Sequence, residues 1–119
     1  MSEAHSVGNT VAAARELTAF QRNVLVILAE RPMYGLAIKR ELEAYYGSEV
    51  NHGRLYPNLD NLVGMDFVAK SELDKRTNQY ELTDEGREAV LDSFEWTLSK
   101  FVTDDDRART VRDLVDEQL

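Results

Sequence analysis

The sequence predicts a mainly α-helical protein that carries one small β-hairpin. Apolar residues recur at helical spacing in three consecutive segments between residues 18 and 64. The period changes to two between residues 67 and 82, which is typical of paired strands. A long amphipathic segment follows residue 83. With 119 residues, the chain fits one domain with terminal extensions.

The first core helix is expected to begin at Thr18, because Thr18 and Gln21 have the spacing of a capping box. Arg31 and Pro32 should end this helix. Residues 1–17 form an N-terminal arm that is expected to be partly helical, because residues 10–17 are rich in alanine. The role of this arm is left open. The expected buried stripe of the helix is Phe20, Val24, Ile27 and Leu28.

Two further helices are expected between residues 32 and 64. Residues 32–35 form a turn, and a second helix then buries Ile38, Leu42 and Tyr45 before it ends at Gly47. A third helix begins at about His52 and buries one row of apolar residues. Pro57 allows two alternatives, a start near residues 53–54 or a kinked helix. The apolar row is Leu55, Leu59, Leu62 and Val63, and the polar row beside it is Asn51, Arg54, Asn58 and Asn61.

The hairpin and a fourth helix complete the order of elements. Residues 67–73 and 79–82 are the expected strands, with residues 74–78 between them. Thr83 is the expected N-cap of a long helix, and residues 103–106 begin a short acidic tail helix. We therefore divide the chain into an arm (1–17), a domain of three helices and a hairpin (18–83), and a C-terminal part (84–119).

Three helices followed by a hairpin is the order of a winged helix-turn-helix domain. Three motifs make the chain resemble the PadR-like transcriptional regulators. The last of the three also occurs in related winged-helix families such as the MarR-like regulators. The motifs are Tyr34-Gly35-Leu36, then Gly53-Arg-Leu-Tyr-Pro57 with Leu59, and Tyr80-Glu-Leu-Thr-Asp-Glu-Gly-Arg87.

This resemblance implies a DNA-binding homodimer, usually a repressor, that reads DNA with its third helix. It implies that the C-terminal helix is the dimerisation element, so the expected fold is a winged helix-turn-helix plus a C-terminal dimerisation helix. The acid-rich chain without cysteine is also similar to haloarchaeal regulators linked to oxidative-stress responses. The expected partner is double-stranded DNA, and a symmetric dimer predicts a palindromic operator.

Side-chain chemistry selects the expected DNA contacts. Arginine presents two donors to guanine and asparagine pairs with adenine, so Arg54 and Asn58 are the leading candidates for reading bases. Lys75 and Arg76 at the hairpin tip should contact the backbone or the minor groove. Any of these residues could instead be an ordinary solvated position. The complete expected set is Ser48, Asn51, His52, Arg54, Tyr56, Asn58, Asn61, Lys75 and Arg76.

An apolar stripe on the fourth helix is the expected dimer interface. A helix outside the core domain that carries such a stripe needs a partner surface. The stripe could also pack against its own domain, but a second copy of the chain is the favoured partner. The interface residues are Val90, Phe94, Leu98 and Phe101, and Leu91 and Trp96 widen the apolar area.

The charge of the chain has the wrong sign for simple attraction to DNA. It has 14 basic and 22 acidic residues, a net charge of −8, and only four of the bases are lysine. Such a composition resembles proteins of salt-loving microbes. In molar salt, counterion release adds little to DNA binding, so positive charge is less needed. Our hypothesis is that Glu72 and Asp74, beside the basic hairpin tip, retain cations that bridge to phosphates.

Several other functions lack support in the sequence. The chain has no cysteine and only two distant histidines, so we expect no metal, no cofactor and no enzyme activity. No apolar run is long enough to span a membrane, and residues 1–9 do not resemble a secretory signal, which predicts a cytoplasmic protein. Two alternatives remain: a protein–protein adaptor without DNA binding, and a repressor gated by a small aromatic effector.

Overall fold

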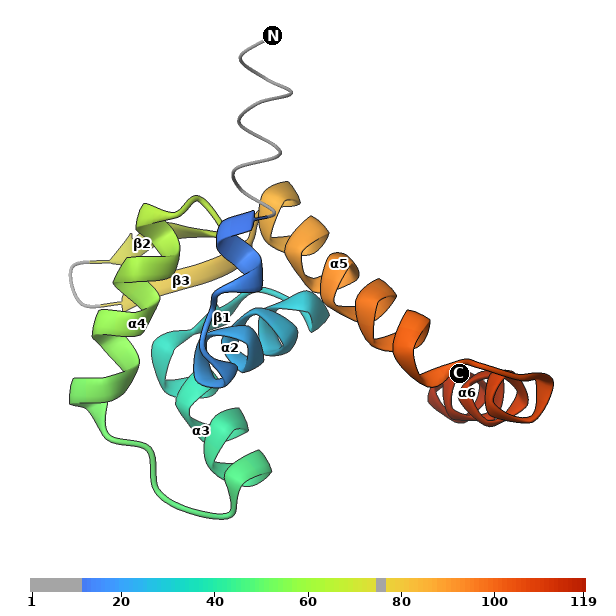
Figure 1. Ribbon diagram of the computed structural model, residues 1–119. Helices are drawn as coiled ribbons and strands as arrows, with labels where there is room; N and C mark the ends of the chain where they lie inside the picture. The colour runs from blue at the N-terminus through green and yellow to red at the C-terminus, as the bar shows by residue number, and fades with distance from the viewer. Residues whose placement is uncertain (1–11, 75–76) are drawn as a thin grey trace, which may run out of the picture.

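The computed structural model describes residues 12–74 and 77–119. Three helices and a small antiparallel sheet form the core domain, and two further helices extend from it (Figure 1). The expected mainly helical fold with a hairpin is therefore confirmed. The elements are α2 (Ala19–Glu30), β1 (Met33–Tyr34), α3 (Gly35–Tyr46), α4 (His52–Gly64), β2 (Val68–Asp74), β3 (Thr77–Leu82), α5 (Asp84–Phe101) and α6 (Asp105–Gln118).

Helix α2 begins with the expected capping box. The Thr18 hydroxyl accepts a hydrogen bond from the Gln21 amide, and the Gln21 side chain accepts one from the Thr18 amide, both at 3.1 Å. Before this helix, residues 12–15 are helical. Ala14 and Leu17 are buried in the hydrophobic core. The described part of the N-terminal arm is thus packed onto the domain, which gives it a structural role that the sequence left open.

Helices α3 and α4 form the helix-turn-helix pair. Glu43 on α3 accepts a hydrogen bond from the Val50 amide at 2.9 Å and binds Lys39 at 2.8 Å, so one carboxylate fastens the turn between the helices. These hydrogen bonds, first from Lys39 and then from Val50, lower the pKa of Glu43. The expected burial of Tyr45 is wrong, because its side chain is 74% exposed at the end of α3.

Helix α4 runs through Pro57. The Asn51 side chain caps its start, and the helix continues from His52 to Gly64 with Pro57 as its sixth residue. The first of the two alternatives, a helix that begins at residues 53–54, is therefore wrong. Because proline has no amide hydrogen, the Gly53 carbonyl receives no helical hydrogen bond from residue 57.

The sheet has three strands rather than two, in the order β1-β3-β2. We expected a turn at residues 32–35, but Met33 and Tyr34 pair with Tyr80 and Gln79 of β3. A pairing across more than 40 residues leaves no local signal in so short a strand. The hairpin strands are longer at the tip than expected, and β2 is exposed except at Val68.

The exit of the hairpin is tightly packed against the start of α5. The Thr83 hydroxyl accepts from the Gly86 amide at 3.0 Å and donates to the Asp66 carbonyl at 2.6 Å. A Cβ atom at Gly86 would collide with the Phe67 carbonyl oxygen and lie 2.6 Å from a Leu82 methyl carbon. Glycine at this position therefore allows α5 to lie against the sheet.

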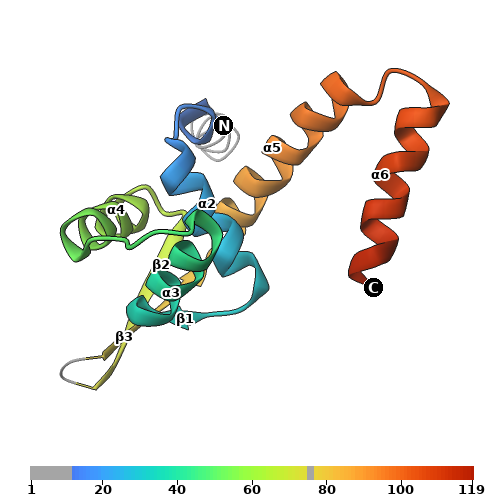
Figure 2. The ribbon, with the colours of Figure 1, turned by 90° about the horizontal axis from the view of Figure 1, so that it is seen from below.

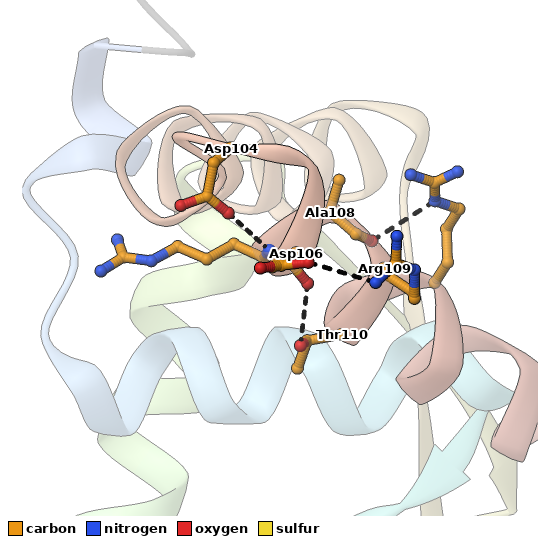
Figure 3. A network of polar contacts seen from close by, with 7 residues as sticks. Asp104, Asp106, Ala108, Arg109 and Thr110 are labelled. Carbon is orange, nitrogen blue, oxygen red and sulfur yellow. Dashed lines mark hydrogen bonds and ion pairs between the residues drawn. The ribbon is translucent and has the colours of Figure 1, made fainter.

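Helix α5 leaves the core domain and leads to α6, which is set apart from it (Figures 1 and 2). Within the domain, α5 contacts α2 and β3. None of the residues of α6 is buried. Polar contacts at its start stabilise it locally: Asp104 caps the Arg107 amide at 2.8 Å, and Asp106 binds Arg109 at 3.1 Å (Figure 3). In the described part of the chain, no helix is apolar enough over a sufficient length to span a membrane.

Candidate nucleic-acid interface

Helix α4 presents one face to the core and the other to solvent. Leu55, Leu59 and Leu62 are fully buried. By helical geometry, the residues opposite these leucines are Gly53, Pro57, Asp60 and Gly64, and all four are exposed. Helix α4 and the β2–β3 hairpin extend toward the same side of the molecule (Figure 2).

Arg54 lies at the edge of the exposed face of α4. Its guanidinium carbon is 4.1 Å from the centre of the Phe20 ring, which is itself stacked on Tyr46. The side chain is exposed, so its donors remain available to a ligand. Stacking on an aromatic ring restricts the arginine and orients its plane before any binding.

The two asparagines of the polar row differ in their surroundings. Asn58 donates to the Arg54 carbonyl at 2.8 Å and accepts from the Gln21 side chain at 3.1 Å, so both ends of its amide are bonded within the domain. Asn61 is exposed, and its side-chain amide has no hydrogen bond within the described residues. Asn61 and Arg54 are seven residues apart, which places them about 20° apart around the helix.

The start of α4 carries the remaining expected contacts. Asn51 accepts a hydrogen bond from the Gly53 amide at 2.6 Å, so its oxygen serves as the helix cap. His52 and Tyr56 are stacked with their ring centres 5.6 Å apart. Ser48 and His52 are exposed at this end of the helix. The structure thus brings the expected residues of α4 to one end and one edge of the helix.

An ion pair joins α4 to the hairpin. Lys70 on β2 lies 3.8 Å from Asp60, and both side chains are largely exposed. Burial raises the pKa of Tyr80, and the nearby Asp60 and Tyr56 raise it further. The Asp60 charge is therefore close to the sheet and is partly compensated by Lys70.

A cavity between α4 and the start of β3 adds residues that the sequence analysis missed. Tyr34, Thr77 and Asn78 line this cavity together with Tyr56 of α4. A local sequence signal could not identify them, because β1 brings Tyr34 beside β3 through a long-range pairing. Lys75 and Arg76 at the hairpin tip lie outside the described residues.

The C-terminal helices form a second surface of interest. Val90 packs partly against the core of its own domain. Phe94, Leu98 and Phe101 are 57%, 38% and 45% exposed, respectively. The Arg107 guanidinium carbon lies 5.3 Å from the centre of the Phe101 ring, at the joint between α5 and α6.

Comparison with solved structures finds relatives that match over almost their whole length. The chain is 66% identical to RosR of H. salinarum over 88% of this chain and 96% of that one, with a TM-score of 0.86. It is 63% identical to the same protein in the hsRosR–S4 complex, over 92% of this chain and 95% of that one, with a TM-score of 0.89. No protein with a curated functional description matches the chain.

A more distant structure supports the fold. F93 from STIV, described as a winged-helix DNA-binding protein, is 14% identical and has a TM-score of 0.56 over 71% of this chain and 90% of that one. This likeness extends the winged-helix fold beyond recognisable sequence similarity. A model of the PadR-like family of transcriptional regulators matches residues 24–92. The chain therefore belongs to the PadR-like family of transcriptional regulators, as its motifs indicated.

Proposed function

We propose that this winged-helix regulator binds DNA in a sequence-specific manner as a homodimer, with α4 in the major groove and the hairpin as the wing. The observation that carries the proposal is the arrangement of α4. Its leucines anchor it in the core, while Arg54 and Asn61 are exposed on one edge of its outward face. A major groove admits one α-helix, whose side chains then reach the base edges.

Arg54 and Asn61 are the residues that we assign to base reading. Both are exposed on the same edge of α4, and their donors match the acceptors of guanine and adenine. The side chain of Asn58 is bonded to the Arg54 carbonyl and to the Gln21 side chain, so we assign it a structural role at the edge of α4. Contacts to the DNA backbone are assigned to Ser48, Asn51, His52 and Tyr56, and to Lys75 and Arg76 at the wing tip.

The exposed apolar face of α5 supports a homodimer. Phe94, Leu98 and Phe101 lie on one side of a helix that has left its own domain. A second copy of the chain would cover this face on both partners at once. Two symmetric copies of α4 about 34 Å apart then require a palindromic operator.

The experiment that tests DNA reading replaces Arg54 with alanine. We expect Arg54→Ala to weaken operator binding by about 10- to 100-fold and to relax specificity at one base pair in each half-site. Arg112→Ala, on α6, is the matched control and should bind as the wild type does. The operator is first selected from random duplexes by the wild-type protein. If wild-type protein selects no duplex, or if Arg54→Ala binds unchanged, α4 is not the reading helix.

The acidic wing predicts an unusual response to salt. If Glu72 and Asp74 retain cations that bridge to phosphates, affinity should fall only slightly, or rise, between moderate and molar potassium chloride. A steep conventional loss would contradict cation bridging without affecting the reading role of α4.

One observation favours a ligand-gated repressor as a second candidate. A cavity of about 220 Å³ lies between α2 and α5, with Leu25, Val26 and Phe94 among its lining residues. An apolar cavity of about 150 Å³ is sufficient for benzene, so a single-ring effector fits the available space. Titration of small aromatic acids into the DNA complex tests this candidate, because release of DNA would identify an effector.

As a regulator of transcription, the protein is assigned to the cytoplasm and is given no catalytic role. A regulator of transcription acts where the DNA is, and the family to which the chain belongs is one of transcriptional regulators. If the wild-type protein selects no duplex in the Arg54→Ala experiment, the result favours an adaptor without DNA binding.

A further inference from the structure

A cavity separates the reading helix from the strand that follows the tip of the wing. Its volume is about 310 Å³, and it lies where the start of α3, the first half of α4 and the start of β3 meet. We call it the wing cavity. In the described part of the chain, it is lined by uncharged residues only, mainly with hydroxyl or amide groups. They are Tyr34, Leu36, Tyr56, Thr77, Asn78 and Tyr80.

Two tyrosine hydroxyls in this cavity are available as donors. Within the described residues, neither the Tyr34 nor the Tyr56 hydroxyl takes part in a hydrogen bond. A Cβ atom at Gly35 would lie 2.6 Å from the Tyr56 hydroxyl, so only glycine lets Tyr56 occupy this place. Tyr80 is different, because it is buried in the core of the domain.

No charged side chain lines the cavity in the described part of the chain. On the elements beside it, Asp60 and Lys70 form an ion pair at 3.8 Å, and Asp74 lies opposite Thr77 in the hairpin. A phosphate here would therefore be held by neutral donors rather than by a cationic side chain. Neutral hydroxyls bonded to a charged phosphate give strong hydrogen bonds.

We propose that the wing cavity receives one phosphate of the DNA backbone and that the hydroxyls of Tyr34 and Tyr56 donate to its oxygens. This inference rests on the proposed DNA binding by α4. In this arrangement a duplex held by α4 and the wing runs past the cavity, because α4 and β3 both line it. The contact fixes the register of the protein on the duplex and carries no sequence information.

The experiment removes the hydroxyls and keeps the rings. Tyr34→Phe, Tyr56→Phe and the double variant are compared with Tyr45→Phe, a matched control on α3 whose ring is 74% exposed and outside the cavity. Binding is measured to a duplex selected by the wild type and to an unrelated duplex of equal length. We expect each single variant to weaken both complexes by about 10-fold, because each loses one hydrogen bond to a charged group.

The salt dependence separates this contact from a cationic one. The slope of log K against log salt should stay unchanged in the double variant, because no counterion-releasing charge is removed. A scan of methylphosphonate substitutions should find one phosphate per half-site whose replacement abolishes the difference between wild type and double variant.

Three results would overturn the proposal. They are double-variant affinity equal to that of Tyr45→Phe, a loss confined to the selected duplex, and a difference from wild type that persists at every methylphosphonate position. In all three, wild-type protein still binds DNA and the proposed function stands. A wild-type protein that binds neither duplex would instead refute the proposed function.

Discussion

The core domain and the C-terminal helices use the same kinds of residue in opposite ways. In the core domain, the leucines of α4 have no exposed surface. On α5, Leu98 is 38% exposed, and none of the residues of α6 is buried. The core domain buries its central apolar residues within one chain, whereas beyond Val90 the large apolar residues of α5 and α6 are not buried.

This difference shows where the fold ends and where assembly begins. Apolar side chains stabilise a protein in proportion to the area that they remove from water. The helices of the core domain obtain this stabilisation from one another. The outer part of α5 and all of α6 can obtain it only from a further surface, and their exposed apolar residues are the reason that we propose a second copy of the chain.

The largest expected effect is a loss of stability when a leucine of the core domain is replaced with alanine. The same replacement on α5 provides the comparison. Leu59→Ala should lower the free energy of unfolding by about 3 kcal/mol, because it leaves a cavity in the core. Leu98→Ala should leave the stability of the dissociated chain nearly unchanged, by about 0.5 kcal/mol or less. Urea unfolding at several protein concentrations measures both. Equal losses that do not depend on concentration would show that α5 is stabilised within its own chain.

The next largest effect concerns self-association. Phe94→Ala should raise the Kd of the dimer by about 30-fold, as expected for an aromatic residue at the centre of an interface. Trp96→Ala is the matched control, because Trp96 is 65% exposed on the same helix but points about 160° away from Phe94. Analytical ultracentrifugation measures both constants. If only Trp96→Ala raised the Kd of the dimer, the interface would lie on the other face of α5.

A smaller effect tests how the helix-turn-helix is held. Glu43→Gln should lower stability at pH 7, because the carboxylate that binds Lys39 and the Val50 amide becomes neutral. The folded pKa of Glu43 is lowered, so its stabilisation is present above the pKa of the unfolded chain and is lost as pH falls through the folded pKa. The difference in Tm between variant and wild type should vanish in acid. Glu41→Gln, exposed on α3, should show no such trend.

The smallest effect concerns the N-terminal arm. Arg15 binds Asp92 of α5 through two hydrogen bonds, at 2.9 and 3.0 Å, and this pairing lowers the pKa of Asp92. Asp92→Asn should speed hydrogen exchange of the Leu17 amide at neutral pH, and the difference should disappear in acid and shrink in high salt. Glu88→Gln on α5 is the control. Unchanged exchange in Asp92→Asn would mean that Ala14 and Leu17 alone hold the arm.

Many local features followed from the sequence because their causes are local. The capping box of Thr18 and Gln21, the cap at Thr83 and the end of α3 at Gly47 depend on residues within one turn of each other. The apolar rows of α2 and α4 were also predictable, since periodic spacing determines which face of a helix is buried.

The candidate site was predicted less completely. Asn58 has the residue type and the position of a base-reading residue, but Gln21, 37 residues away, engages its amide. Tyr45 continues the apolar spacing of α3, yet the domain ends before it can be covered. The spacing of residues within one helix predicts which of them share a face. It does not predict which residues of other elements pack against that face.

The sequence by itself determined the order of the helices and the hairpin, the family and the polar edge of α4, because these depend on local patterns and motifs. Only the tertiary structure decided that β1 joins the sheet, that Asn58 is bonded to Gln21 and that Tyr34 and Tyr56 line one cavity. The physical reason is that each of these features joins residues that are distant in the chain. Their contacts exist only after the helices have packed.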